Sequence, residues 1–255
     1  MDYAKIKEVF DNYVDSYENE EMILLKKYHS YAVSDLMAEL AYRLKLSDEQ
    51  IILAKVIGLL HDIGRFEQYK KYKSYNDKNG DHAVIGCKYL FEEGHIRDYI
   101  TDPSYDEVIN KAIRYHNTLK LPNLDGDVEL FSKMIRDMDK VDIYKQMAIH
   151  SHAKFDAKEV SEKVLGEFKK EKTIDLGFVK SKSDAIITRL AFIFDFNFNE
   201  SFDILVDTDN FDLYLSVIEV TEDSEKLWRK IREECFDKIN RGVKVGGNNN
   251  VRKKI

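Results

Sequence analysis

Hydrophobic positions along this chain recur mostly at spacings of three and four residues, a pattern that is typical of amphipathic α-helices. The pattern predicts helices over residues 2–18, 20–45, 83–93, 156–170, 184–194 and 222–240, and two short helices within residues 200–219. Within residues 20–45, the inward face that the spacing predicts consists of Leu24, Leu25, Tyr28, Ala32, Leu36, Leu40 and Leu44. The chain therefore reads as a series of helices with short connections.

The most apolar helix is predicted at Ile51–Leu60, where Lys55 is the one charged residue. A helix this apolar is buried on most of its sides. Ser47 and Gln50 stand at the spacing of a capping box, in which each side chain hydrogen-bonds the backbone of the other residue. We therefore expect a well-defined helix start that leads into the interior of the protein.

This helix ends at the doublet His61-Asp62, which Gly64 and Arg65 follow. Two ionisable side chains at a buried helix end are costly unless they have partners. A metal ion suits an imidazole and a carboxylate together. Gly64 is expected to permit a sharp backbone turn, and Arg65 adds a fixed positive charge beside the doublet.

Composition supports a helical protein. The 255 residues include only 2 prolines and 11 glycines, and 44% of them are hydrophobic. Few helix breakers and long amphipathic stretches predict an all-α fold with a sizeable core. No internal repeat or linker is evident, so we expect a single helical domain over residues 1–245 and a disordered tail over residues 246–255.

Charge and cysteine content narrow the functional classes. The net charge is −7 and no dense basic block is present, which argues against binding a nucleic acid polymer. The longest apolar run is too short to cross a bilayer, and the first residues lack an apolar signal segment, so no membrane association is predicted. Cys87 and Cys235 have no paired spacing, which is typical of reduced thiols in the cytoplasm.

Further histidines and aspartates lie at or beside the buried end or face of predicted helices. With the doublet, the set is His29, His61, Asp62, His82, His116 and Asp139. Neighbouring members are separated by about one helix and one connection, so antiparallel helices would return them to one end of a bundle. Helix bundles build metal sites in this way. Asp137 and Asp142 are alternatives to Asp139, because they lie in the same helix.

The order His29, His61-Asp62 and Asp139 resembles the HD-domain superfamily of metal-dependent phosphohydrolases. The string His61–Arg65 is close to a common form of that family's doublet, and Asp137–Asp142 resembles its late motif, whose register selects Asp139. The resemblance covers residues 20–150 and implies an all-α helical bundle. Residues 155–242 would then be a C-terminal helical extension.

The resemblance implies that His29, His61, Asp62 and Asp139 hold one divalent metal ion. Imidazoles and carboxylates suit Mn, Fe, Co, Ni or Zn and do not choose among them. His82 and His116 match the additional histidines of those members that bind a second metal, with Asp62 as the bridge. In members with one metal these positions line the pocket instead, and the sequence leaves one or two metals open.

The activity that the resemblance implies is hydrolysis of a phosphomonoester or phosphodiester by a metal-activated water that Asp62 orients. Arg65 would bind phosphate oxygens, and His82 or His116 would protonate the leaving oxygen. The expected partner is a small phosphorylated substrate, with nucleotides among the candidates. The chain lacks the Gly-Tyr-Pro signature of cyclic-dinucleotide phosphodiesterases and the His-Asp-x-x-Glu-Asp form of guanosine tetraphosphate hydrolases.

Two other functional classes stay open at this point. The same six positions serve a minority of this fold as a di-iron oxygenase. They could also form a catalytically silent metal-binding module with a regulatory role. A homodimer formed through the C-terminal helices is a further alternative that the sequence does not decide.

Overall fold

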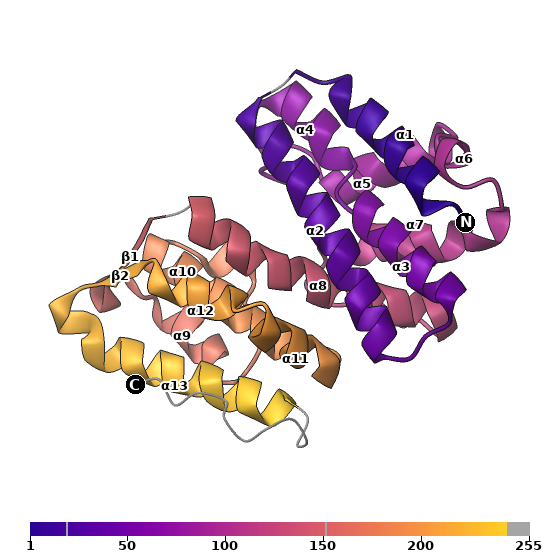
Figure 1. The fold of residues 1–255 in the computed structure, drawn as a ribbon. Coiled ribbons are helices and arrows are strands. Elements are labelled where there is room, and N and C mark those ends of the chain that lie inside the picture. The colour runs from indigo at the N-terminus through magenta and orange to yellow at the C-terminus, as the bar shows by residue number, and fades with distance from the viewer. Residues whose placement is uncertain (19, 151, 244–255) are drawn as a thin grey trace. The chain divides into compact units, whose positions relative to one another are not determined.

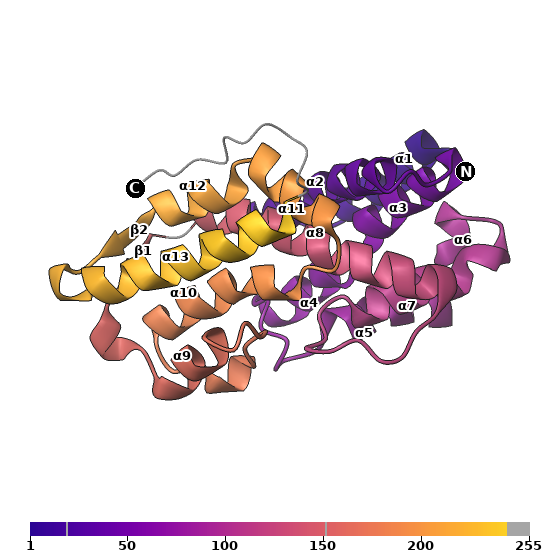
Figure 2. The ribbon, with the colours of Figure 1, turned by 90° about the horizontal axis from the view of Figure 1, so that it is seen from below.

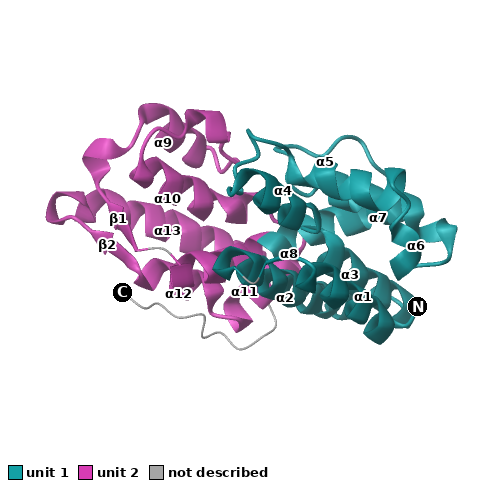
Figure 3. Ribbon diagram, turned by 90° about the horizontal axis from the view of Figure 1, so that it is seen from above, with its two compact units in different colours: residues 1–139 teal, residues 140–255 magenta. Residues whose placement is uncertain are grey.

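A computed structural model describes residues 1–18, 20–150 and 152–243 of the chain. The chain forms two compact units, Met1–Asp139 and Lys140–Ile255 (Figure 3). The tail at residues 246–255, which the sequence predicts to be disordered, lies outside the described residues. A single domain over residues 1–245 remains a prediction.

The first unit consists of helices (Figure 1). They are α1 (Tyr3–Asp15), α2 (Glu21–Arg43), α3 (Asp48–Leu60), α4 (Gly64–Tyr72), α5 (His82–Cys87) with a π-helical turn (Lys88–Glu92), α6 (Ile96–Tyr99), a 3₁₀ turn (Pro103–Tyr105), α7 (Asp106–Tyr115) and the first part of α8 (Gly126–His150). The capping box at the start of α3 is present, since Gln50 N donates to Ser47 Oγ and Ser47 N donates to Gln50 Oε1.

The second unit contains the end of α8 and the helices α9 (Glu162–Phe168), α10 (Lys182–Leu190), α11 (Asn199–Asp207), α12 (Asn210–Ser216) and α13 (Glu225–Gly242), with 3₁₀ turns at Ala157–Glu159, Leu176–Phe178, Ala191–Asp195 and Glu222–Ser224. The strands β1 (Ala153–Phe155) and β2 (Ile218–Val220) pair in parallel, and both lie at one end of this unit (Figures 1 and 2). Strands of three residues are too short to show alternation, so the sequence did not predict them. The all-α fold class is confirmed apart from this small sheet.

Residues 156–170, predicted as one helix, are divided. A 3₁₀ turn ends at Glu159, and Ser161 then begins α9 by accepting a hydrogen bond from Val164 N. A serine that caps a helix favours a new start over continuation, because its side chain satisfies a backbone N–H.

Across the described residues, no helix combines the length and apolarity that crossing a bilayer requires.

The buried face of α2 differs from the predicted one. It consists of Ile23, His29, Ser30, Val33, Ser34, Met37, Leu40 and Ala41, so only Leu40 of the predicted set is fully buried. Tyr28 is 62% exposed. The serines explain the error: a side chain at Gly58 of α3 would lie 2.7 Å from the Cα of Ser34, so small residues are needed where α2 and α3 approach. This rotation turns His29 inward.

Gly64 serves close packing, and the prediction that it permits a turn is wrong. It has ordinary helical geometry at the start of α4, and only Gly94 and Gly126 among the described glycines have positive φ. A Cβ on Gly64 would instead collide with the carbonyl oxygen of His82. The glycine therefore allows α5 to approach α4 and brings His82 near the end of α3.

Candidate metal centre

Asp62 is the central residue of the candidate site. Its side chain follows the end of α3 and is buried. The Oδ2 atom lies 3.6 Å from His29 Nε2 and 3.7 Å from His61 Nε2. The Oδ1 atom lies 3.1 Å from His82 Nε2 and 3.7 Å from His116 Nε2. The two carboxylate oxygens therefore face two different pairs of imidazoles.

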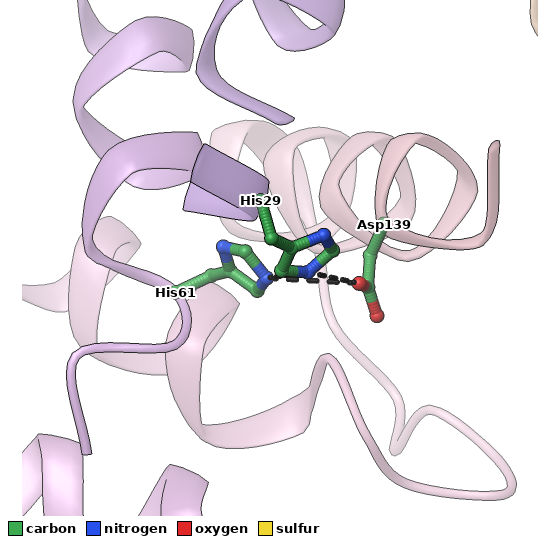
Figure 4. A group of neighbouring side chains, drawn as sticks. All are labelled: His29, His61 and Asp139. Atoms are coloured by element: carbon green, nitrogen blue, oxygen red, sulfur yellow. Dashed lines mark hydrogen bonds and ion pairs between the residues drawn. The ribbon is translucent and has the colours of Figure 1, made fainter. Parts of the chain in front are cut away.

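Asp139 completes the first pair (Figure 4). Its Oδ1 lies 3.1 Å from His29 Nε2 and 3.6 Å from His61 Nε2, and the two Nε2 atoms are 3.3 Å apart. The side chains come from α2, the residue after α3, and α8. Asp137 and Asp142 are also buried, but of the three aspartates the structure groups only Asp139 with histidines at metal-binding distances. The register chosen from the motif therefore agrees with the geometry.

The second pair is formed by His82, the first residue of α5, and His116, the residue after α7. Their Nε2 atoms lie 2.9 Å apart, and both rings are buried. With Asp62, the structure thus brings together all six residues that the sequence singled out.

Backbone carbonyls orient two of the four rings. The Nδ1 of His61 lies 2.7 Å from Gly58 O, and the Nδ1 of His116 lies 2.7 Å from Ile113 O. A carbonyl oxygen only accepts hydrogen bonds, so each Nδ1 must carry the proton. In the neutral rings, the Nε2 atoms that face Asp62 therefore present lone pairs.

The His82 ring is oriented by a carboxylate. Its Nδ1 lies 2.8 Å from Asp77 Oδ1. Burial raises the pKa of Asp77, but the hydrogen bond from His82 and nearby positive charges outweigh it and lower the pKa to about 2. The acceptor is therefore ionised at neutral pH, which places the proton on Nδ1 and the lone pair on Nε2. A carboxylate behind a ligating histidine is a common arrangement in metal sites.

This donor set fits divalent metal ions. Lone pairs on the Nε2 atoms of His82 and His116 cannot face each other at 2.9 Å without a proton or a cation between them. Ligands at about 2.1 Å from a metal are separated from one another by roughly 3.0–3.4 Å in octahedral or tetrahedral geometry. The donor separations run from 2.9 to 3.7 Å, so they span that range and exceed it by a few tenths of an ångström.

Both carboxylates of the site are ionised. Burial raises the pKa of Asp62, but the charge of Lys26 and the contacts with the surrounding histidines outweigh it and hold the pKa well below its usual range. Burial also raises the pKa of Asp139, but its contacts with His29 and His61 outweigh this effect and hold the pKa well below its usual range. Ionised carboxylates are the form that binds a metal.

Arg65, predicted to bind phosphate, is engaged elsewhere. Its Nη1 donates to Gln68 Oε1 at 2.9 Å, to Tyr75 O at 2.8 Å and to Asp77 Oδ1 at 2.8 Å. Its Nε lies 3.5 Å from Asp62 Oδ1 and makes no hydrogen bond. The guanidinium therefore adds positive charge beside Asp62 while one of its arms is held by the connection between α4 and α5.

Two residues at the site escaped the sequence reasoning. The Nζ of Lys26 lies 2.7 Å from Asp62 Oδ2. Lys26 stands three residues before His29, so helical spacing places both on one face of α2 and could have identified it. Asp77 lies in a polar connection, where no periodicity distinguishes it from its neighbours.

Arg136 is a third residue that the sequence did not identify. Its side chain is buried, and its Nη1 donates to the carbonyl oxygens of Tyr115, His116 and Thr118 at 3.3, 3.3 and 2.5 Å. These carbonyls belong to the end of α7 and the residues after it. A cation at a helix C-terminus satisfies backbone acceptors and interacts favourably with the helix dipole. Arg136 therefore holds the backbone that carries His116.

Residues 27–144 match the family model described as HD domain. All six residues of the metal centre lie within the match. No significant match was found to a curated protein or to a solved structure. HD domains are helical and most are metal-dependent hydrolases, in agreement with the fold and with the donor set. Residues 27–144, a little under half of the chain, are therefore similar to the HD domain.

Proposed function

We propose that this protein is a metal-dependent phosphohydrolase that cleaves an ester bond of a small phosphorylated molecule. One observation carries the proposal: the two oxygens of Asp62 face two separate histidine pairs. A carboxylate placed in this way can bridge two cations, as in two-metal sites that hydrolyse phosphate esters.

The geometry favours two metal ions over one. His29, His61 and Asp139 would hold the first ion, and His82 and His116 the second, with Asp62 shared between them. Bound divalent metals would polarise a phosphoryl group and supply a nucleophile from water near neutral pH. Asp77 and the carbonyl oxygens behind the rings keep the Nε2 lone pairs aimed at the centre.

This assignment competes with the role in proton transfer that the sequence suggested for His82 or His116. An Nε2 atom that binds a metal cannot also carry a proton to a leaving group. The Nδ1 atoms are not available either, since they donate to Asp77 and to Ile113 O. The number of metals per chain therefore decides the role of His82 and His116. With two metals they are ligands, and with one metal they can donate a proton to the leaving group.

The first test is metal content by elemental analysis, on protein purified without a chelator or a metal-binding tag. The same protein is then assayed against phosphomonoesters, phosphodiesters and nucleotides, with Asp62→Asn as the matched control. Two equivalents of metal and turnover that the control lacks would support the proposal. Metal binding without turnover of any ester would contradict it and favour a regulatory module.

A di-iron oxygenase is the second candidate, because the same two-metal geometry suits it. Two equivalents of iron, together with oxygen consumption and no ester hydrolysis, would put it ahead. Equal ester hydrolysis in air and under argon would exclude oxygen as a reactant. Localisation in the cytoplasm and a homodimer remain predictions.

A further inference from the structure

Lys26 is the one lysine that contacts the metal centre among the described residues. Its ammonium makes an ion pair of 2.7 Å with Asp62 Oδ2, the oxygen that faces His29 and His61. An ammonium has three N–H donors. Within the described chain this ion pair uses one of them, so two donors remain for an additional acceptor.

Lys26 also lies on the side of the site that solvent reaches. Its side chain is 16% exposed, as is that of Asp139, whereas the rings of His61 and His82 are 0% and 1% exposed. Arg65, the other cation beside Asp62, is 14% exposed. Lys26 and Arg65 are therefore the two positive side chains of the site that solvent reaches, and Lys26 is the one on the Oδ2 side of Asp62.

The surroundings hold Lys26 in place. Its Nζ lies 5.7 Å from the ring centre of Tyr75, a distance at which a cation interacts with an aromatic face. The Tyr75 hydroxyl donates to Met22 O at 2.6 Å, one turn before Lys26 in α2. Arg65 lies at the same distance from this ring, with one arm bound to Asp77. One arm of Arg65 is therefore anchored in the protein, while Lys26 is held by a single ion pair and keeps two N–H donors.

We propose that Lys26 binds the phosphate group of the substrate and so is a substrate-binding residue of the site. This inference rests on the proposed function. A charged hydrogen bond to phosphate is stronger than one between neutral groups, so a positive residue at this position would favour anionic esters over neutral analogues of the same size.

The same geometry predicts an opposing effect on the metal. The Lys26 ammonium lies against Asp62 Oδ2, the oxygen that faces His29 and His61 and would coordinate a metal there. A metal bound to that oxygen is repelled by the ammonium and competes with it. Removing the lysine charge should therefore strengthen metal binding while it weakens phosphate binding. A merely structural residue would weaken both.

The chain offers a matched control. Lys27 is the next residue of α2, has a similarly buried side chain at 14% exposed, and forms an ion pair of 2.6 Å with Asp15. It differs in that its partners are Asp15 and Asp11 rather than a residue of the metal centre. Lys27→Met therefore removes an ion pair of similar length, with a more exposed partner, without touching the site.

The test uses the full chain and isothermal titration calorimetry. Mn²⁺ is titrated into metal-free wild type, Lys26→Met, Lys26→Arg and Lys27→Met, and inorganic phosphate is then titrated into each Mn²⁺-loaded protein. For Lys26→Met we expect phosphate to bind about 10- to 100-fold more weakly, the loss typical of a charged hydrogen bond, and Mn²⁺ to bind more tightly. Lys26→Arg should recover most of the phosphate affinity.

Several outcomes would overturn the inference. Unchanged phosphate affinity in Lys26→Met would show that the lysine does not bind phosphate, and equal losses in Lys26→Met and Lys27→Met would show a structural effect. If wild type hydrolyses esters while Lys26→Met binds phosphate normally, this inference alone fails. If Mn²⁺-loaded wild type neither binds phosphate nor hydrolyses an ester, the proposed function fails with it.

Discussion

The Nε2 atoms of His82 and His116 face each other at 2.9 Å, while both Nδ1 atoms donate away from the centre. Two neutral imidazoles in this arrangement would direct lone pairs at each other, which is unfavourable unless a proton or a metal ion lies between them. The pair can therefore accept a cation, and Asp62 supplies the negative charge beside it.

Removing one ring of the pair should remove one metal. His82→Ala and His116→Ala are each expected to lower the metal content from two equivalents per chain to one, because His29, His61 and Asp139 still hold the first ion. Elemental analysis of the purified variants measures this directly. An unchanged content would mean that these histidines only line the pocket.

Asp62→Asn should abolish both sites. The amide keeps the size of the side chain but loses the charge that both histidine pairs share. We expect metal binding to be lost and ester hydrolysis to fall by roughly 100-fold or more, beyond the 10- to 100-fold typical of residues behind metal ligands. Retained turnover at the wild-type rate would contradict the mechanism.

Arg136→Met should weaken the second metal selectively. It leaves carbonyl acceptors at the end of α7 without a buried donor, at a cost of about 1–3 kcal/mol in the free energy of unfolding. Since His116 belongs to that segment, affinity for the second ion should fall about 10-fold. Calorimetric metal titration and urea unfolding measure the two effects.

The control for Arg136 lies one turn earlier in α8. Lys133 pairs with Glu129 on the surface, and such a pair contributes at most about 1 kcal/mol. Lys133→Met should leave both metal affinities unchanged. Equal effects of the two substitutions on the second metal would show that Arg136 has no special role in positioning His116.

Gly64→Ala should destabilise the first unit. The added methyl group would collide with the carbonyl of His82, and overpacking of this kind costs about 1–3 kcal/mol. The control is Gly166→Ala in α9, where a Cβ meets nothing within 4 Å. That change should stabilise the helix by about 0.5–1 kcal/mol. Chemical denaturation measures the free energy of unfolding of both variants, which should fall for Gly64→Ala and rise for Gly166→Ala. A Gly64→Ala variant as stable as wild type would refute the close packing.

The buried thiol of Cys87 predicts a loss of stability at alkaline pH. Burial raises the pKa of this thiol to about 11, whereas an unfolded cysteine ionises near 8.5. Between these values the folded state holds a proton that the unfolded state releases, so the free energy of unfolding falls as the pH rises. Urea titrations should show a shallower fall for Cys87→Ala, and identical slopes would contradict the assignment.

The sequence by itself determined most of the helices and the residue types that meet at the candidate site. Helical spacing and capping depend on residues a few positions apart, so the capping box at Ser47 and the buried helix after it could be predicted. The doublet His61-Asp62 stands at the end of that helix for the same local reason. The motif register that selects Asp139 is also local, and the geometry agrees with it.

Only the tertiary structure decided which face of α2 is buried and which groups pair across the centre. The contact of Ser34 with Gly58 and the ion pair of Lys26 with Asp62 join residues far apart in the chain. Helical spacing cannot specify such pairs, because rotating a helix by one residue costs little until it meets a neighbour. The packing of α2 on α3 set that rotation, and with it the residues that face the metal centre.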